Sequence, residues 1–251
     1  MNKLKLKNNF DLCYPILESD PSSIRKKIEA TISKRVKFYE LRIDYLLDNM
    51  VSIDDIIYYI NDLNRDFSGK RFIVTIRTKK EGGAIDLSLY KYFSYIEKLI
   101  GKLKVSYIDI EYKYYSLALD AFNALIKKTN LKIILSKHIF DHEFSKENCE
   151  DIIKQLIKTR CNIVKLAVMI DKKNDLFSFM NIAKEYSIKL RDMNKDAIFI
   201  AMGEMGRLSR IYPEYTNTKI VFVNAYENNS ILGQYSLDSY IEYRKLLAKL
   251  G

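Results

Sequence analysis

Residues 162–169 read NIVKLAVM, an apolar run that contains one charged side chain, Lys165. A strand buried on both faces is continuously apolar, whereas a strand with one face in water alternates apolar and polar residues. Similar runs, rich in β-branched and aromatic residues, are DLCYPIL (11–17), VKFYELRI (36–43), RFIVTIR (71–77), VSYIDIEY (105–112), LKIILSK (131–137), AIFIAM (197–202) and KIVFVNA (219–225). Together these runs predict eight buried strands.

Each gap between the runs has room for one helix, and several gaps show helical apolar periodicity, for example SIDDIIYYINDLNRDF (52–67) and ENCEDIIKQLIKTR (147–160). Eight buried strands, each followed by a helix, predict a (β/α)8 barrel, an α/β fold. We expect residues 1–251 to form it as a single domain, with a short N-terminal strand or hairpin that closes the barrel bottom. An open, doubly wound sheet is the alternative.

The N-terminal sequence, the apolar stretches and the cysteines indicate the cellular compartment that we expect for the chain. The first ten residues, MNKLKLKNNF, have no apolar core like that of a signal peptide, and no apolar stretch approaches the ~20 residues that cross a bilayer. Cys13, Cys149 and Cys161 form no CxxC pair, which favours reduced thiols over a zinc site or a disulfide framework. We therefore expect a cytoplasmic protein without a membrane partner.

A net charge of +10 raises the possibility of nucleic-acid binding. Such binders usually gather their basic residues into a patch or stripe, often with aromatic residues between them. Here the lysines are scattered along the chain, which favours a solvated surface and no nucleic-acid partner.

Glycines gather at three of the expected strand ends. Five of the eight follow the third, seventh and eighth strands: Gly82, Gly83, Gly203, Gly206 and Gly233. Glycine lets the backbone turn tightly or approach a ligand closely, and barrel active sites form from the loops that follow the strands. These loops are the expected place of the chemistry.

Lys165 is the first candidate for a reactive group. Strand alternation places it on one face with Ile163 and Ala167, inside the barrel if that face is interior. Burial disfavours the charged ammonium and frees the amine as a nucleophile. The alternatives are a lysine whose ammonium reaches solvent at the strand end and a register in which the side chain points at a helix. The run alone does not decide among these possibilities.

Both histidines of the chain fall in SKHIFDHE, at the end of the fifth expected strand. Histidine exchanges protons readily near neutral pH. His138 is nearer the strand end and is the candidate acid/base group, whereas His142 is expected to be a surface residue. A metal site from the two would need a helix between them, which Phe140 and Asp141 do not favour. We expect no metal site.

Charged and polar residues recur at the other strand ends, often at every second position. They are Glu40, Arg42, Asp44, Arg77, Glu81, Asp109, Glu111, Arg207, Ser209, Arg210, Ser230 and Gln234. A structural layer of ion pairs would explain any one of them. The combination of arginine, serine and glutamine is also what a hydroxylated carboxylate needs from its site.

These residues, taken in order, resemble the type I 3-dehydroquinate dehydratase family. The matching motifs are ELRID (40–44), TIRTKKEGG (75–83), DIE (109–111), SKH (136–138), VKLAVM (164–169), MGEMGRLSR (202–210) and SILGQYSLD (230–238). The resemblance runs from about residue 10 to the C-terminus. It implies a (β/α)8 barrel, usually a homodimer, that needs no cofactor and dehydrates 3-dehydroquinate to 3-dehydroshikimate in the shikimate pathway of aromatic amino acid biosynthesis.

The resemblance also implies a role for each matching residue. Lys165 matches the Schiff-base lysine, His138 the general acid/base, and Glu81 the carboxylate that orients the histidine. Residues that hold the substrate's hydroxyls and shape the pocket are matched by Glu40, Arg42 and Arg77, and those that receive its carboxylate by Arg210, Ser230 and Gln234. Ile231 and Leu232 replace an Ala-Pro pair that is frequent in the family, which predicts a differently shaped lid.

A class I aldolase or a transaldolase is the enzymatic alternative, because unrelated activities share a barrel with a strand lysine. An enzyme for sugar phosphates would have a glycine-rich phosphate site after the seventh and eighth strands. Here those loops carry Arg210, Ser230 and Gln234, which suit a carboxylate.

Overall fold

The computed structural model describes residues 10–224 and 233–250. Its strands are β1 (Asp11–Ile16), β2 (Phe38–Arg42), β3 (Arg71–Thr75), β4 (Tyr107–Glu111), β5 (Lys132–Ile139), β6 (Ile163–Met169), β7 (Asp196–Met202) and β8 (Ile220–Phe222). Each of the eight predicted runs contains or overlaps one of them. The expected N-terminal hairpin would involve residues 1–9, which lie outside the described residues.

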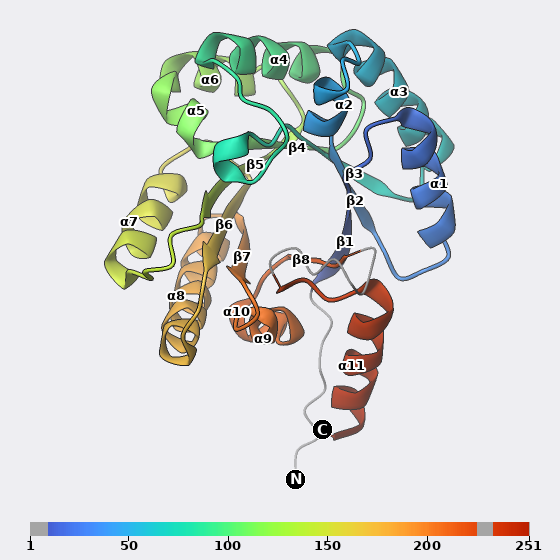
Figure 1. Ribbon diagram of the computed structural model, residues 1–251. Coiled ribbons are helices and arrows are strands. Elements are labelled where there is room, and N and C mark those ends of the chain that lie inside the picture. The colour runs from blue at the N-terminus through green and yellow to red at the C-terminus, as the bar shows by residue number, and fades with distance from the viewer. Residues whose placement is uncertain (1–9, 225–232, 251) are drawn as a thin grey trace. The chain divides into compact units, whose positions relative to one another are not determined.

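Helices follow every strand along the described chain (Figure 1). They are α1 (Pro21–Thr31), α2 (Asp44–Asp48), α3 (Ile53–Asp66), α4 (Leu89–Lys102), α5 (Tyr112–Leu117), α6 (Leu119–Ile126), α7 (Lys146–Ile157), α8 (Lys173–Asp192), α9 (Arg207–Ile211), α10 (Pro213–Thr216) and α11 (Leu237–Leu250). Helix α3 illustrates why the sequence forms a helix at its position. The Ser52 hydroxyl caps its first turn by accepting from the Asp55 N–H, and Ile53, Ile56 and Ile60 bury one face at helical spacing.

The chain divides into two compact units. The first comprises the described part of residues 1–14 together with 139–157 and 164–251, and the second comprises 15–138 and 158–163. Strands β2 to β5 lie side by side and parallel in the second unit. Their register aligns Arg42 with Thr75 and Thr75 with Asp109, so the carboxyl ends of these strands meet at one edge.

In the first unit, the first and last strands of the chain pair with each other. Strand β1 runs parallel to β8, with Cys13 opposite Phe222. Pairing between the first and last strands is what closes a barrel and is absent from an open, doubly wound sheet. The fold class is therefore the predicted (β/α)8 barrel rather than the open alternative.

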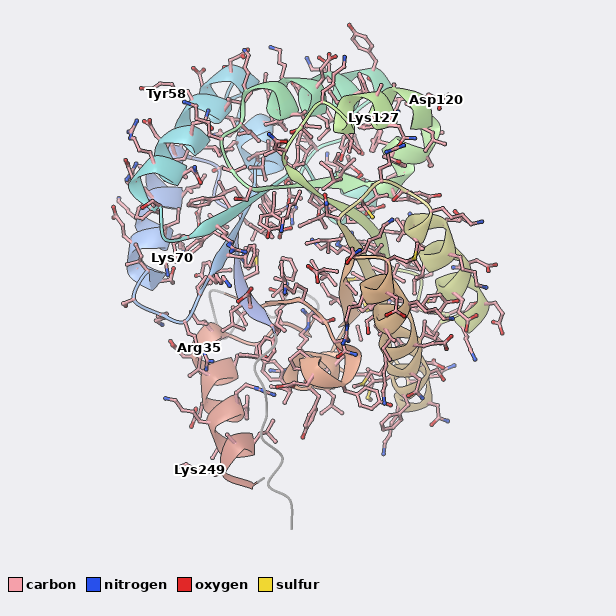
Figure 2. The ribbon with its side chains drawn as sticks, turned by 180° about the vertical axis from the view of Figure 1, so that it is seen from behind. Arg35, Tyr58, Lys70, Asp120, Lys127 and Lys249 are labelled. Carbon is pink, nitrogen blue, oxygen red and sulfur yellow. The ribbon has the colours of Figure 1, made fainter. Side chains whose placement is uncertain are left out.

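Several composition-based expectations can be checked on the described residues. Cys13, Cys149 and Cys161 are buried thiols, the reduced state that was predicted. No helix in the described ranges is both long and apolar enough to cross a membrane. In the second unit, the exposed basic residues Arg35 and Lys127 lie in separate turns, after α1 and after α6 (Figure 2), as expected for scattered surface charge.

Candidate active site

Arg77, just beyond β3, is the centre of a buried ion cluster in the second unit. Only 2% of the residue is exposed. Its Nη2 donates to Asp109 Oδ1 at 2.9 Å, and its Nη1 donates to Ser136 Oγ at 2.9 Å. The same Nη1 lies 3.3 Å from Glu111 Oε1 and 3.4 Å from Glu81 Oε2. Strand alternation produces the cluster, because Asp109 and Glu111 lie two residues apart on β4.

The cluster keeps the guanidinium charged. Burial alone lowers the pKa of Arg77, but Asp109, Glu111 and Glu81 together outweigh burial and raise the pKa above its ordinary value. Burial raises the pKa of Glu111, which is opposed by Arg77 and by two bonds from Thr78. Those bonds run from the Thr78 N–H to Glu111 Oε1 at 2.8 Å and from its hydroxyl to Oε2 at 2.9 Å. The end of β3 is therefore tied to the end of β4.

Glu81 and His138 form a hydrogen-bonded pair at the edge of this cluster. His138 Nδ1 lies 2.9 Å from Glu81 Oε2, which also accepts the His138 backbone N–H at 3.1 Å. Burial raises the pKa of the Glu81 carboxyl, and the positive charges of Arg77 and Lys137 oppose that rise. The imidazole side chain is 13% exposed, so a small part of the ring remains accessible.

A tight turn brings Glu81 back towards β5. The 3-10 helix Lys79–Glu81 ends at Gly82, whose φ of 82° is left-handed. A Cβ atom at Gly83 would lie 1.8 Å from the carbonyl oxygen of Arg77, so no larger residue fits there without a backbone shift. The left-handed backbone at Gly82 and the close approach at Gly83 together explain the paired glycines seen in the sequence.

Glu40 and Arg42 lie at the end of β2, as alternation predicted. Glu40 Oε1 accepts from the Thr75 hydroxyl at 3.1 Å, and the residue is 5% exposed. Arg42 donates from Nε and Nη2 to the two oxygens of Asp44, both at 2.8 Å. Burial lowers the pKa of Arg42, and the bond to Asp44 more than compensates. Asp44 also accepts the Arg77 N–H at 3.3 Å, which links the ends of β2 and β3.

Lys165 is buried within the first unit. It lies in β6 and is 3% exposed. Its Nζ lies 4.5 Å from the centroid of the Phe222 ring on β8, within the range of a cation–π contact. The alternative of a lysine whose ammonium reaches solvent is therefore wrong, because almost none of the residue is accessible.

Arg210 lies in the short helix α9 of the same unit and is 5% exposed. Burial lowers its pKa to about 10. Gln234 is half-buried and directly follows Gly233, where a Cβ atom would lie 2.0 Å from the Gly203 carbonyl oxygen. Ser230, Ile231 and Leu232 lie outside the described residues.

His142 is a surface residue, as predicted. Its side chain is 73% exposed and its Nδ1 lies 2.5 Å from Asp171 Oδ2. Within the described ranges, no group of three or more His, Cys, Asp or Glu side chains could hold a metal ion.

The structure thus groups the predicted residues by unit. Glu40, Arg42, Arg77, Glu81 and His138 gather in the second unit, and Lys165, Arg210 and Gln234 belong to the first. Three further residues that contact the cluster, Thr78, Ser136 and Lys137, were not predicted as site residues. Asp109 and Glu111 had stood out only by their alternation, and nothing in that pattern pairs them with Arg77.

Eight parallel strands with buried ionisable groups at their carboxyl ends define a (β/α)8-barrel enzyme. Residues 12–250 match the family model of the type I 3-dehydroquinases. The chain is 33% identical over 210 residues to a 3-dehydroquinate dehydratase of Streptococcus suis, covering 83% of this chain and 86% of that one. To the enzyme of the same name from Streptococcus sanguinis it is 29% identical over 229 residues, which cover 90% and 95% of the two chains.

The chain belongs to the type I 3-dehydroquinase family. It is by this membership a 3-dehydroquinate dehydratase, a hydro-lyase of the shikimate pathway, and the aldolase alternative is wrong. The fold agrees with that of a type I 3-dehydroquinate dehydratase from Clostridium difficile. The TM-score is 0.84 at 21% identity, with 96% of this chain and 93% of that chain covered.

Proposed function

We propose that the chain removes water from 3-dehydroquinate through an imine between Lys165 and the C3 ketone. The burial of Lys165 carries this proposal. An amine that is 3% exposed gains little hydration as an ammonium ion, which favours the neutral nucleophile. Once the iminium has formed, the Phe222 ring at 4.5 Å favours its positive charge.

The iminium is the electron sink of the proposed reaction. Attack of Lys165 on the ketone releases one water and leaves a cation that acidifies the neighbouring C2 hydrogen. His138 removes that proton to give an enamine and then protonates the departing C1 hydroxyl, which leaves as water. Hydrolysis of the product imine consumes one water and restores the amine, so the net change is the loss of one water.

Glu81 is proposed to prepare His138 for both proton transfers. The 2.9 Å contact between Nδ1 and Oε2 favours the tautomer in which Nδ1 carries the proton. The lone pair on Nε2 then accepts the C2 proton. The carboxylate also stabilises the imidazolium that results, in the same way as the buried carboxylate of a catalytic triad.

Arg210 is proposed as the main counter-charge of the substrate's carboxylate, and Ser230 and Gln234 are proposed as further residues that receive this carboxylate. Burial has lowered the pKa of this guanidinium to about 10, and an anion that binds beside it would stabilise its charged form. Glu40 and Arg42 would contact the substrate's hydroxyls. Arg77 would shape the pocket by holding Asp109, Glu111 and Glu81 in place, because these carboxylates already surround its guanidinium.

The domain organisation, oligomeric state, cellular compartment and cofactor independence are proposed from the family resemblance. The two units would form one barrel domain, two copies of which make a homodimer that works in the cytoplasm without a cofactor. Sedimentation equilibrium on the purified chain tests the dimer. Activity that survives exhaustive dialysis against a chelator tests the independence from metal.

An ultraviolet assay of the conjugated product from 3-dehydroquinate tests the proposed function. We expect activity in the wild type and a loss of about 1000-fold or more in Lys165→Met. Lys70→Met is the matched control, because the Lys70 ammonium is held by the carbonyl oxygens of Ile32 and Val36, both at 2.8 Å. Wild-type activity in Lys165→Met would contradict the proposal.

A further inference from the structure

The two oxygens of the Glu81 carboxylate have different partners. Oε2 faces His138 at 2.9 Å, whereas Oε1 lies 3.4 Å from the ammonium of Lys137. Lys137 and His138 are consecutive residues of β5, so their side chains leave the strand on opposite faces. A four-carbon stem is long enough to bring the ammonium around to the same carboxylate.

The Lys137 side chain is 31% exposed, in contrast to the 1% exposure of Glu81. Its ammonium therefore keeps part of its hydration, while the carboxylate that it faces is almost fully desolvated. A partly hydrated cation beside a buried anion stabilises that anion without a large desolvation penalty of its own. Arg77, the other cation beside Glu81, also forms ion pairs with Asp109 and Glu111.

We propose that Lys137 is a positioning residue for the acid/base pair: it holds the Glu81 carboxylate beside His138 and tunes the proton affinity of both groups. The role of His138 in this statement rests on the proposed function above. The geometry itself, one carboxylate between an imidazole and an ammonium, does not depend on it.

The sign of the effect follows from the charges that face the pair. Those around Glu81 are Arg77 from the end of β3, Asp109 and Glu111 from β4, Lys137 and His138 from β5, and the Tyr114 phenol from α5. The ammonium of Lys137 opposes proton uptake by Glu81 and, by the same electrostatics, by His138. Its removal therefore raises the proton affinity of both members of the pair, whichever of them is assigned the proton.

Histidine titration by NMR measures this effect directly. The chain has only two histidines, His138 and His142, so labelling with 15N-histidine gives the NMR signals of two imidazoles. In the His142→Gln variant, His138 is the single histidine that gives a signal. In that background we expect Lys137→Met to raise the pKa of His138 by roughly 0.5 to 1 unit. Lys137→Arg keeps the positive charge and is expected to keep the pKa of the parent.

Lys132→Met is the matched control, because Lys132 lies on the same strand, at its exposed beginning. Lys132→Met removes the same charge about 16 Å from Lys137 along the strand. The pKa of His138 should therefore not change in this variant. In the kinetic counterpart, the acidic limb of kcat/KM shifts to higher pH in Lys137→Met alone. A merely structural role of Lys137 would lower the melting temperature without moving this limb.

An unchanged or lowered His138 pKa in Lys137→Met, or an equal rise in Lys132→Met, would overturn the proposal. The titration needs no substrate. A failure of the imine chemistry on Lys165 would therefore leave its outcome intact, and the two proposals can fail separately.

Discussion

The imidazole Nδ1 of His138 lies 2.9 Å from Oε2 of Glu81, a residue 57 positions earlier in the chain. The parallel register of β3, β4 and β5 brings these positions together, since each strand ends at the same edge. The 3-10 helix that carries Glu81 ends at the glycine pair Gly82 and Gly83. The candidate acid/base group is thus held by a partner from another strand end.

Glu81→Gln tests the importance of that carboxylate charge. The amide can still contact the ring but no longer stabilises the imidazolium, so we expect kcat/KM to fall about 10- to 100-fold. Because an anion beside imidazole raises its pKa, its loss shifts the acidic limb of the pH profile to lower pH. Glu185→Gln is the control, as Glu185 pairs with Lys189 on an exposed helix face. An acidic limb that moves upward would contradict the assignment.

His138→Ala separates imine formation from proton transfer. Lys165 is still present in this variant, so the imine should form and be trapped by borohydride. Turnover should fall by about 100- to 10,000-fold, the usual contribution of a positioned acid/base group. His142→Ala serves as the control, since that side chain is 73% exposed. Equal turnover in the two variants would remove His138 from the mechanism.

Asp109→Asn tests the ion cluster as a structural element. Asp109 and Arg77 are 2.9 Å apart, with side chains that are 0% and 3% exposed. Removal of this charge leaves the buried Arg77 guanidinium with only Glu111 and Glu81 as its counter-charges, so denaturant unfolding should show a loss of up to about 3–5 kcal/mol. Asp54→Asn, which breaks exposed contacts with Lys98 and Lys102, should change the unfolding midpoint little. Equal midpoints for the two variants would show that the cluster does not contribute.

Gly83→Ala tests the turn that carries Glu81. The added Cβ would lie 1.8 Å from the Arg77 carbonyl oxygen, and the required shift should destabilise the fold by roughly 1–3 kcal/mol. It should also lower kcat, because Glu81 moves away from His138. Gly69→Ala is the matched control, with nothing within 4 Å of the new atom. Normal stability and activity in Gly83→Ala would show that the turn accommodates a side chain.

The strands could be predicted because a strand that is buried on both faces is continuously apolar, and such runs are visible in the sequence. The run that contains β6 left the burial of Lys165 undecided, and the 3% exposure of the residue decides it. Alternation correctly placed Glu40 and Arg42 at the end of β2. These features are local, and a single strand pattern is enough to infer them.

The pairing among strand ends was not predictable from local patterns. Arg77 was assigned to the residues that hold the substrate's hydroxyls and shape the pocket, and no local pattern indicated that its guanidinium contacts Asp109, Glu111 and Ser136. The register between β3, β4 and β5 decides those contacts, and no spacing in the sequence encodes it. Lys137 was missed for a related reason, since alternation assigns it the face opposite to His138.

Borohydride reduction of the enzyme with 3-dehydroquinate tests the central claim most directly. The intact mass should rise by one reduced adduct per chain, and peptide mapping should place the adduct on Lys165. Lys165→Met should show no adduct, whereas Lys70→Met should trap it as the wild type does. A stable adduct on the same peptide of Lys165→Met, or turnover of the wild type without any trapped species, would contradict the account.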